Sequence, residues 1–232
     1  MDFKNKVVII TGASSGIGRG AAEYLSSLGA SVVLTGRSEN GLKETASKCT
    51  TEFLIVIADV TKQEDRVKII DETIKKFGKI NVLVNNAGQG LMKETMKATM
   101  EEYDFIMDLN VRSVFNLTQL AIPHLIETQG NIVNVSSVTG LHPFPGFTVY
   151  CMSKAALDQF TRCLALELAP KNVRVNAINP ATIVTNFLQA QGLSDQLAKE
   201  YQTKGASLHA LGRLGTILET SHAIAFLASD MS

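Results

Sequence analysis

Short aliphatic runs alternate with longer helix-like stretches along most of the chain, and this alternation limits the possible folds more than any other feature. The runs predict strands over residues 6–11, 31–35, 52–58, 80–85, 130–136 and 173–178. Between them, apolar residues recur at helical spacing over residues 18–28, 40–48, 64–77, 101–127 and 150–169. The runs do not alternate polar with apolar residues, which is typical of strands buried on both faces. We therefore expect one α/β domain over residues 1–232, with a doubly wound, Rossmann-like parallel sheet and helices on both faces.

Composition and charge exclude several classes of protein. The chain has 232 residues, of which 45% are hydrophobic, so it can bury a core without metal or disulfide cross-links. Its 22 Lys and Arg residues balance 22 Asp and Glu residues, whereas proteins that bind nucleic acid usually carry a basic excess. No apolar run approaches the roughly 18 residues of a membrane span. The three cysteines have no metal-ligand spacing. We expect reduced thiols, no metal site and a cytoplasmic location.

A glycine-rich turn follows the first predicted strand. It reads Thr11-Gly12-Ala13-Ser14-Ser15-Gly16-Ile17-Gly18, and its glycines permit a tight turn and a close approach of the backbone to a ligand. The helix that follows directs its N-terminal amides and its positive dipole end toward that ligand, which suits a pyrophosphate. The alternative is a turn that binds nothing. We expect the turn to bind a dinucleotide through Gly12, Ser14, Ser15, Gly16, Ile17 and Gly18.

The end of the second predicted strand bears on the choice of cofactor. Dinucleotide folds usually place a carboxylate there, about 20 residues beyond the glycines, for the ribose hydroxyls of NAD. This chain has Arg37 and Ser38 instead. A guanidinium matches a phosphate dianion in charge and geometry, so the sequence favours NADP(H) over NAD(H). The alternative is that Arg37 is a solvated loop charge.

Tyr150 and Lys154 are the strongest candidates for catalytic chemistry. A spacing of four residues places both on one face of the predicted helix. Free tyrosine titrates near 10 and a nearby ammonium favours the phenolate, so we expect Lys154 to lower the pKa of Tyr150. The Ser137 hydroxyl could hydrogen-bond a substrate oxygen. Together these groups could move a proton on or off that oxygen while a hydride moves on the adjacent carbon. Taken alone, a Tyr-x-x-x-Lys pair is more often a surface pair.

Several motifs occur together in one order and spacing. They are Thr11-Gly12-x-x-x-Gly16-x-Gly18, Asp59-Val60, Asn85-Asn86-Ala87-Gly88, Asn110, Ser137, Tyr150-x-x-x-Lys154 and Asn179-Pro180. With these motifs the chain resembles the short-chain dehydrogenase/reductase family, and the resemblance extends from residue 6 to the end of the chain. Each motif is weak to moderate by itself, whereas the set is specific.

The resemblance implies a catalytic role for four residues. Tyr150 would be the acid/base, and Lys154 would lower its pKa and hold the nicotinamide ribose. Ser137 would orient the substrate oxygen. Asn110 would anchor a water on the proton path from Lys154 to bulk solvent; the alternative for Asn110 is an amide that stabilises its helix.

The resemblance also implies further cofactor contacts. Asp59 and Val60 would contact the adenine ring, although Asp59 could instead cap the turn before Thr61. The remaining positions support the cofactor beside the central strand or hold its carboxamide: Asn86, Gly88, Pro180, Ile183 and Thr185. For Asn85 we expect a structural role at the end of its strand.

Two features depart from the family pattern. Pro180-Ala181 stands where the family usually has Pro-Gly, and a Cβ there is costly if the backbone needs a positive φ. The chain also stops at Ser232, where the family normally continues into a final strand. We therefore expect a sheet without that strand, whose incomplete edge would weaken assembly.

These observations predict an NADP(H)-dependent oxidoreductase that interconverts a carbonyl and a secondary alcohol of a small molecule. The alternatives are an NAD-linked alcohol dehydrogenase and a nucleotide-sensing protein without turnover. Residues 186–211 would form a substrate lid whose apolar side chains either cover the substrate or pack on the body. The resemblance also suggests a homodimer or homotetramer, with the helices over residues 101–127 and 150–169 at an interface.

Overall fold

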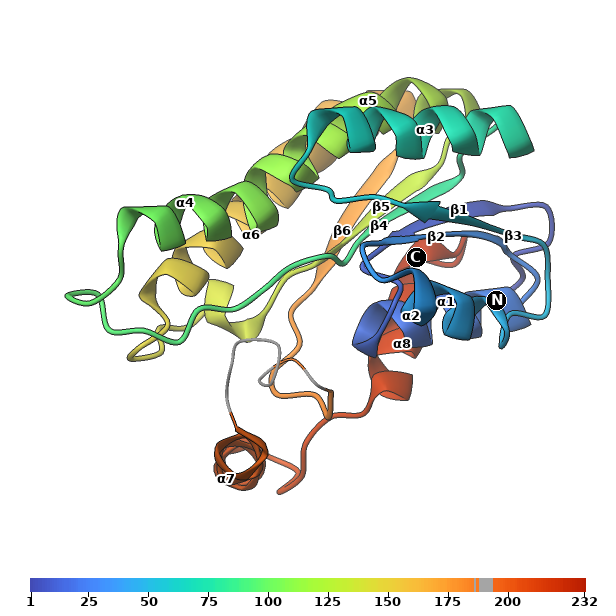
Figure 1. The fold of residues 1–232 in the computed structure, drawn as a ribbon. Helices are drawn as coiled ribbons and strands as arrows, with labels where there is room; N and C mark the ends of the chain where they lie inside the picture. Colours follow the sequence, from blue (N-terminus) through green and yellow to red (C-terminus); the bar gives the residue numbers. More distant parts are fainter. Residues whose placement is uncertain (186, 188–193) are drawn as a thin grey trace.

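A six-stranded parallel sheet forms the centre of the molecule, with the strand order β3-β2-β1-β4-β5-β6 (Figure 1). The structure is a computed structural model that describes residues 1–185, 187 and 194–232. Every strand lies within a predicted run or extends one residue past it, so the expected doubly wound sheet is confirmed. The strands are β1 (Val7–Thr11), β2 (Ser31–Gly36), β3 (Phe53–Ile57), β4 (Val82–Asn85), β5 (Asn131–Val135) and β6 (Arg174–Ile178).

Helices cover both faces of the sheet, as predicted (Figure 1). One face carries α1 (Gly16–Ser27), α2 (Glu39–Ala46) and α8 (Ile217–Ala228). The other carries α3 (Gln63–Phe77), α5 (Ser113–Thr128) and α6 (Thr148–Leu168). Of these six, α8 was not among the predicted helices; it packs against α1, where the ring of His222 lies tilted against that of Tyr24 with centroids 4.6 Å apart.

A separate hydrophobic cluster fills the space on each side of the sheet. Successive side chains of a strand point to opposite faces. Val8 and Ile10 of β1 accordingly pack with α1 and α8, whereas Val7 and Ile9 pack with the α3, α5 and α6 side. All four are nearly inaccessible to solvent. This double burial explains why the strand sequences are continuously apolar.

The predicted helix over residues 101–127 is not uniform. α4 (Met100–Met107) continues into α5 through a π-helical segment, η1 (Asp108–Arg112). Such segments add a residue to one helical turn and are frequent at functional sites. The apolar spacing on either side stays helical, so the sequence pattern did not reveal the change. Asn110 lies inside η1 and is 1% exposed.

Asn85 has the structural role expected for the end of its strand. Its Nδ2 donates to Asn134 Oδ1 at 2.9 Å and to Thr118 Oγ1 at 3.1 Å. Asn134 in turn donates to Thr161 Oγ1 at 2.9 Å. These buried side chains satisfy one another and join β4 and β5 to the helices behind them.

The predicted lid is described only in part, because residues 186 and 188–193 lie outside the described residues. Within it, α7 (Asp195–Leu208) stands apart from the sheet (Figure 1). α7 buries Ala198, whereas Leu197 and Tyr201 are 48% and 41% exposed. These two side chains are therefore only partly covered by the body of the protein.

No helix in the described ranges has the length and apolar character needed to cross a bilayer. Within the same ranges, no three side chains of His, Cys, Asp or Glu gather in a way that could hold a metal ion.

Candidate active site

Most of the predicted site residues lie at the carboxyl edge of the sheet. β1 leads to Gly12, β4 leads to Asn86 and Gly88, and β5 leads to Ser137. The first turn of α6 brings Tyr150 to the same region, where its side chain lies near that of Ser137. Ligands of doubly wound folds bind beyond this edge.

Gly12 and Gly18 allow the turn after β1 to pack closely on the loop after β4. Gly12 has a φ of +66°, and a Cβ at this position would lie 2.9 Å from Asn86 Nδ2. A Cβ at Gly18 would overlap the same amide. Asn86 Nδ2 donates to the carbonyls of Thr11 at 2.8 Å and Gly12 at 3.3 Å. Gly12 and Gly18, two of the three motif glycines, therefore leave room for the Asn86 side chain, which joins the loop after β4 to the turn after β1.

The N-terminus of α1 suits an anionic group. Ser15 is its N-cap residue, and its hydroxyl makes no capping hydrogen bond. The first turn also contains no acidic residue. The first amides of a helix have no acceptor within the helix, and the helix dipole adds positive potential there. The residues present therefore fit a diphosphate, with Gly16, Ile17 and Gly18 as the positions that would hold it.

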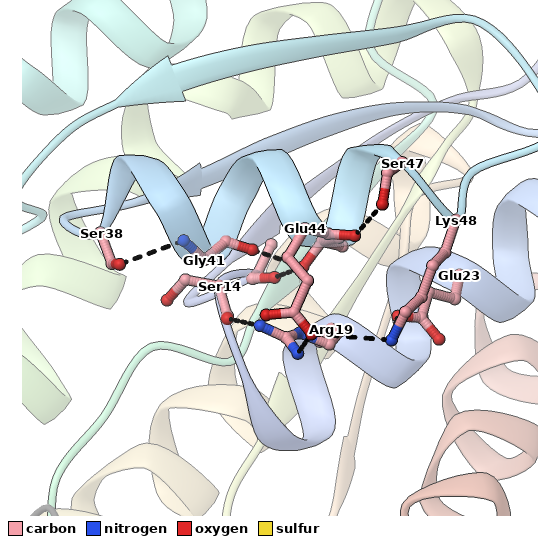
Figure 2. Close-up of polar contacts among 10 residues, drawn as sticks. Ser14, Arg19, Glu23, Ser38, Gly41, Glu44, Ser47 and Lys48 are labelled. Carbon is pink, nitrogen blue, oxygen red and sulfur yellow. Dashed lines mark hydrogen bonds and ion pairs between the residues drawn. The ribbon is translucent and has the colours of Figure 1, made fainter.

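Arg19 connects the glycine-rich turn to α2 through its guanidinium (Figure 2). Its guanidinium donates to the Ser14 carbonyl at 2.6 Å and pairs with Glu44 at 2.5 Å. Beside it, Thr45 Oγ1 donates to the Ala13 carbonyl at 2.8 Å. The motifs did not single out Arg19, because its partner lies 25 residues away. The sequence does contain one signal for Arg19. It is a cation in the first turn of a helix, where the helix dipole disfavours a positive charge unless an anionic partner compensates it.

Arg37 directly follows β2 and is exposed. It makes no hydrogen bond or ion pair with the rest of the described chain. The neighbouring Ser38 caps α2, since its Oγ accepts from the Gly41 amide at 3.2 Å. The structure thus places Arg37 and Ser38 together, and their binding of a phosphate stays a prediction.

Asp59 closes the turn after β3. Its Oδ1 accepts from the Thr61 amide at 3.0 Å and from Thr61 Oγ1 at 2.8 Å, which is the capping geometry weighed from the sequence. Burial opposes ionisation of Asp59. Hydrogen bonds from Thr61 and the charges of Arg37 and Lys62 nevertheless hold its pKa below its ordinary value. Val60 beside it is 7% exposed. The adenine contact of these two residues stays a prediction.

Tyr150 is enclosed, with 8% of its surface exposed. The rings of Phe147 and Phe187 lie beside it, at centroid distances of 6.4 Å and 6.0 Å. Burial raises the pKa of Tyr150 to about 12, and a hydrogen bond with Ser137 offsets part of that rise. The sequence-based expectation of a lowered pKa is therefore wrong for the chain by itself, because desolvation of the phenolate outweighs the favourable contacts.

Lys154 lies one helical turn after Tyr150 and is 4% exposed. Its Nζ donates to the Val135 carbonyl at 2.9 Å and is 5.7 Å from the centroid of the Tyr150 ring. Burial lowers the pKa of Lys154 to about 8, and the carboxylate of Asp158 opposes that fall. The pair is therefore buried on one helix face, unlike the surface pair weighed from the sequence.

Asn110 braces the loop after β4 against α6. Its Nδ2 donates to the Gln89 carbonyl at 2.9 Å and to Ser153 Oγ at 3.0 Å, while its Oδ1 accepts from the Gln89 amide at 3.0 Å. A Cβ at Gly88 would lie 3.1 Å from that Oδ1 and 3.6 Å from Lys154 Nζ. Both amide hydrogens of Asn110 are thus used within the protein, and its water-anchoring role stays a prediction.

The segment from Pro180 to Thr185 runs beside the site. The Pro180 carbonyl accepts from the Val138 amide at 3.0 Å, and Ile183 pairs with Gly215 in a parallel bridge. Ala181 is not among the residues with positive φ, so alanine in place of the usual glycine causes no backbone strain here. Thr185 faces the glycine turn, since a Cβ at Gly16 would lie 3.5 Å from its methyl carbon. The segment therefore lies next to the turn that is expected to bind the dinucleotide.

Comparison with known proteins identifies the family of this chain. The family model for short chain dehydrogenase matches residues 6–196. A 3-oxoacyl-[acyl-carrier-protein] reductase from Thermotoga maritima is 34% identical, over 100% of this chain and 94% of the relative. A meso-2,3-butanediol dehydrogenase from Serratia marcescens is 35% identical, over 99% of this chain and 90% of the relative.

A solved structure shows the same architecture. It is a short-chain dehydrogenase/reductase of unknown function from Caenorhabditis elegans, crystallised with cofactor. Its TM-score is 0.92 and its identity 38%, over 97% of this chain and 89% of that one. From its motifs, its fold and these relatives, the chain belongs to the short-chain dehydrogenase/reductase family.

Proposed function

We propose that the chain is an NADP(H)-dependent oxidoreductase that interconverts a carbonyl group and a secondary alcohol, with Tyr150 as the acid/base. The observation that carries this proposal is the enclosed Tyr150 side chain, which lies next to Ser137 and one helical turn before the buried Lys154. The relatives support the reaction class, because one is a reductase of a 3-oxoacyl group and another is a dehydrogenase of a diol.

In this proposal a bound nicotinamide dinucleotide supplies the hydride that reduces the substrate carbon. Ser137 Oγ orients the substrate oxygen by a hydrogen bond. The Tyr150 hydroxyl gives its proton to that oxygen as the carbonyl becomes an alcohol. The ammonium of Lys154, 5.7 Å from the Tyr150 ring centroid, stabilises the phenolate that remains. Oxidation of the alcohol uses the same groups in reverse.

The protonation states of the pair suit reduction near neutral pH. Because the pKa of Tyr150 is about 12, the phenol holds its proton there. Because the pKa of Lys154 is about 8, most of its ammonium stays charged at pH 7. A protonated tyrosine beside a charged lysine is a general acid, which is the role that carbonyl reduction requires.

Two alternatives lead to different observations. An NAD-linked alcohol dehydrogenase would use the same acid/base but would not prefer the phosphorylated cofactor. A nucleotide-sensing protein would bind the cofactor and never consume it. The intact group of Ser137, Tyr150 and Lys154 favours turnover, because a protein that only senses needs no proton donor beside its ligand.

Consumption of NADPH and of NADH should be followed in parallel against ketones, diketones, aldehydes and a β-keto thioester. We expect turnover with at least one carbonyl class, faster with NADPH than with NADH. Tight binding of NADPH without consumption across the whole panel would favour the sensing alternative. Turnover that prefers NADH would favour the NAD-linked alternative.

The same proposal includes a homodimer or homotetramer formed through α4, α5 and α6. Apolar side chains on these helices are exposed: Phe105, Phe115, Met152 and Leu166. Burying such side chains removes apolar surface from water, which favours association. Light scattering of the purified chain should give the mass of a dimer or tetramer; a monomer mass over the working concentration range would contradict this part of the proposal.

A further inference from the structure

Asp158 is a buried carboxylate to which the catalytic scheme assigns no role. It lies on α6 one helical turn after Lys154 and two turns after Tyr150, and it is 4% exposed. Asn179 Nδ2 lies 3.0 Å from one carboxylate oxygen of Asp158 and 3.1 Å from the other. The 3-10 turn η2 (Val138–Gly140) packs against it, because a Cβ at Gly140 would overlap the carboxylate.

The buried ammonium of Lys154 needs compensation for its loss of hydration. Within the described chain, the ammonium donates to the Val135 carbonyl, which is a neutral acceptor. A charge out of water is costly unless an opposite charge or several hydrogen bonds compensate. Side chains four residues apart on a helix are neighbours, and the Asp158 carboxylate, which makes no direct ion pair with Lys154, provides an opposite charge that acts on it through space. Its field raises the pKa of Lys154 against the larger effect of burial, which lowers that pKa.

Three charged groups on elements next to α6 make their contacts elsewhere. Asp108 pairs with Arg112 inside η1. Glu102 of α4 pairs with Lys93. Arg174 of β6 donates to the carbonyls of Leu227 and Ser229. On α6 itself, Cys151 lies beside Tyr150, and Arg162, Cys163 and Glu167 lie further along the helix, so Asp158 is the carboxylate of α6 that acts on Lys154.

We propose that Asp158 is a positioning residue whose negative charge keeps Lys154 protonated and whose bond to Asn179 holds α6 against the segment that leads to Pro180. This inference rests on the proposed function, because it assigns the charge of Lys154 a part in proton transfer. Asn179 directly precedes Pro180 and also donates to the Ser137 carbonyl at 3.0 Å. Asp158 is therefore linked to both sides of the site, to Lys154 by charge and to the Ser137 backbone through Asn179.

Asp158→Asn tests the charge separately from the shape, because the amide oxygen can still accept from Asn179. Removing a negative charge favours the deprotonated form of every nearby group, so the pKa values of both Lys154 and Tyr150 should fall. We expect the pH–rate profile of carbonyl reduction to move to lower pH by about one unit, with its alkaline limb moving most clearly. Glu167→Gln is the matched control, since it removes the same charge from an exposed position on α6.

A second readout does not depend on turnover. The Cε signal of Lys154 can be titrated by NMR in cofactor-free protein and assigned with Lys154→Met. We expect a midpoint near pH 8 in the wild type, about one unit lower in Asp158→Asn and unchanged in Glu167→Gln. Thermal unfolding checks that each variant is folded. Asp158→Ser, which also removes the charge, replaces Asp158→Asn if the latter does not fold.

The outcomes separate this inference from the proposed function. A lowered Lys154 midpoint together with a shifted rate profile would support it. An unchanged midpoint in a folded Asp158→Asn protein would overturn it, whether or not the enzyme turns over. If the wild type consumes no cofactor but its Lys154 midpoint still depends on Asp158, the proposed function fails and the electrostatic coupling stands.

Discussion

Tyr150→Phe will lower the rate of carbonyl reduction by about 100- to 10,000-fold while NADPH binding stays within a few-fold of the wild type. This range is what a positioned general acid contributes. Phenylalanine keeps the ring that packs against Phe147 and Phe187 and removes only the hydroxyl oxygen, which lies near Ser137. The loss of one polar contact of a hydroxyl costs about 1 kcal/mol of stability, which a folded domain tolerates.

The measurement is single-turnover oxidation of NADPH, with cofactor affinity followed separately by fluorescence titration. Tyr103→Phe is a matched control because it removes a tyrosine hydroxyl from α4, outside the candidate site. We expect this control to retain the wild-type rate. A Tyr150→Phe enzyme that turns over within a few-fold of the wild type would show that another group supplies the proton.

Arg37→Glu is expected to reverse the cofactor preference. The exposed guanidinium of Arg37 makes no hydrogen bond or ion pair within the described chain, so it is available to a ligand phosphate. A charge-assisted hydrogen bond contributes about 1.5–3 kcal/mol, which corresponds to roughly 10- to 100-fold in affinity. The carboxylate adds repulsion of the phosphate dianion. We therefore expect NADPH affinity to fall at least about tenfold while NADH affinity is kept or improved.

The quantity to measure is the ratio of the NADPH and NADH dissociation constants. Lys43→Glu makes the same change in charge on α2, where Lys43 pairs with Glu39, and should change the ratio much less. The pKa of Asp59 should also rise in Arg37→Glu, because the cation that helps to keep it ionised is gone. If the ratio in Arg37→Glu equals that of the wild type, Arg37 is a solvated loop charge, as the alternative interpretation holds.

The sheet was predictable because its signal is local. Each strand contributes a continuous apolar run, since both of its faces are buried, and this pattern is complete within about six residues. The break in the helix over residues 101–127 was not predictable in the same way. The π-helical turn η1 keeps the apolar spacing of its flanks, and its purpose becomes visible only in the contacts of Asn110 with Gln89 and Ser153.

The candidate site likewise contains residues that the sequence could identify and residues whose role depends on tertiary contacts. Ser137, Tyr150 and Lys154 could be chosen from motif spacing, and the fold brings them together. Arg19 could not be assigned from the motifs, because its role depends on Glu44, which reaches it only when α2 packs beside α1 (Figure 2). Asp158 likewise acquires its partner Asn179 from the end of β6.

The amino-acid sequence alone determined the order of strands and helices, the residues proposed to carry the chemistry and the family to which the chain belongs. The tertiary structure alone decided the electrostatic state of those residues. Four residues separate Tyr150 from Lys154, and this spacing suggested a tyrosine of lowered pKa. The enclosing side chains raise it to about 12 instead. The reason is that desolvation depends on every atom around a group, and those atoms come from segments far apart in the chain.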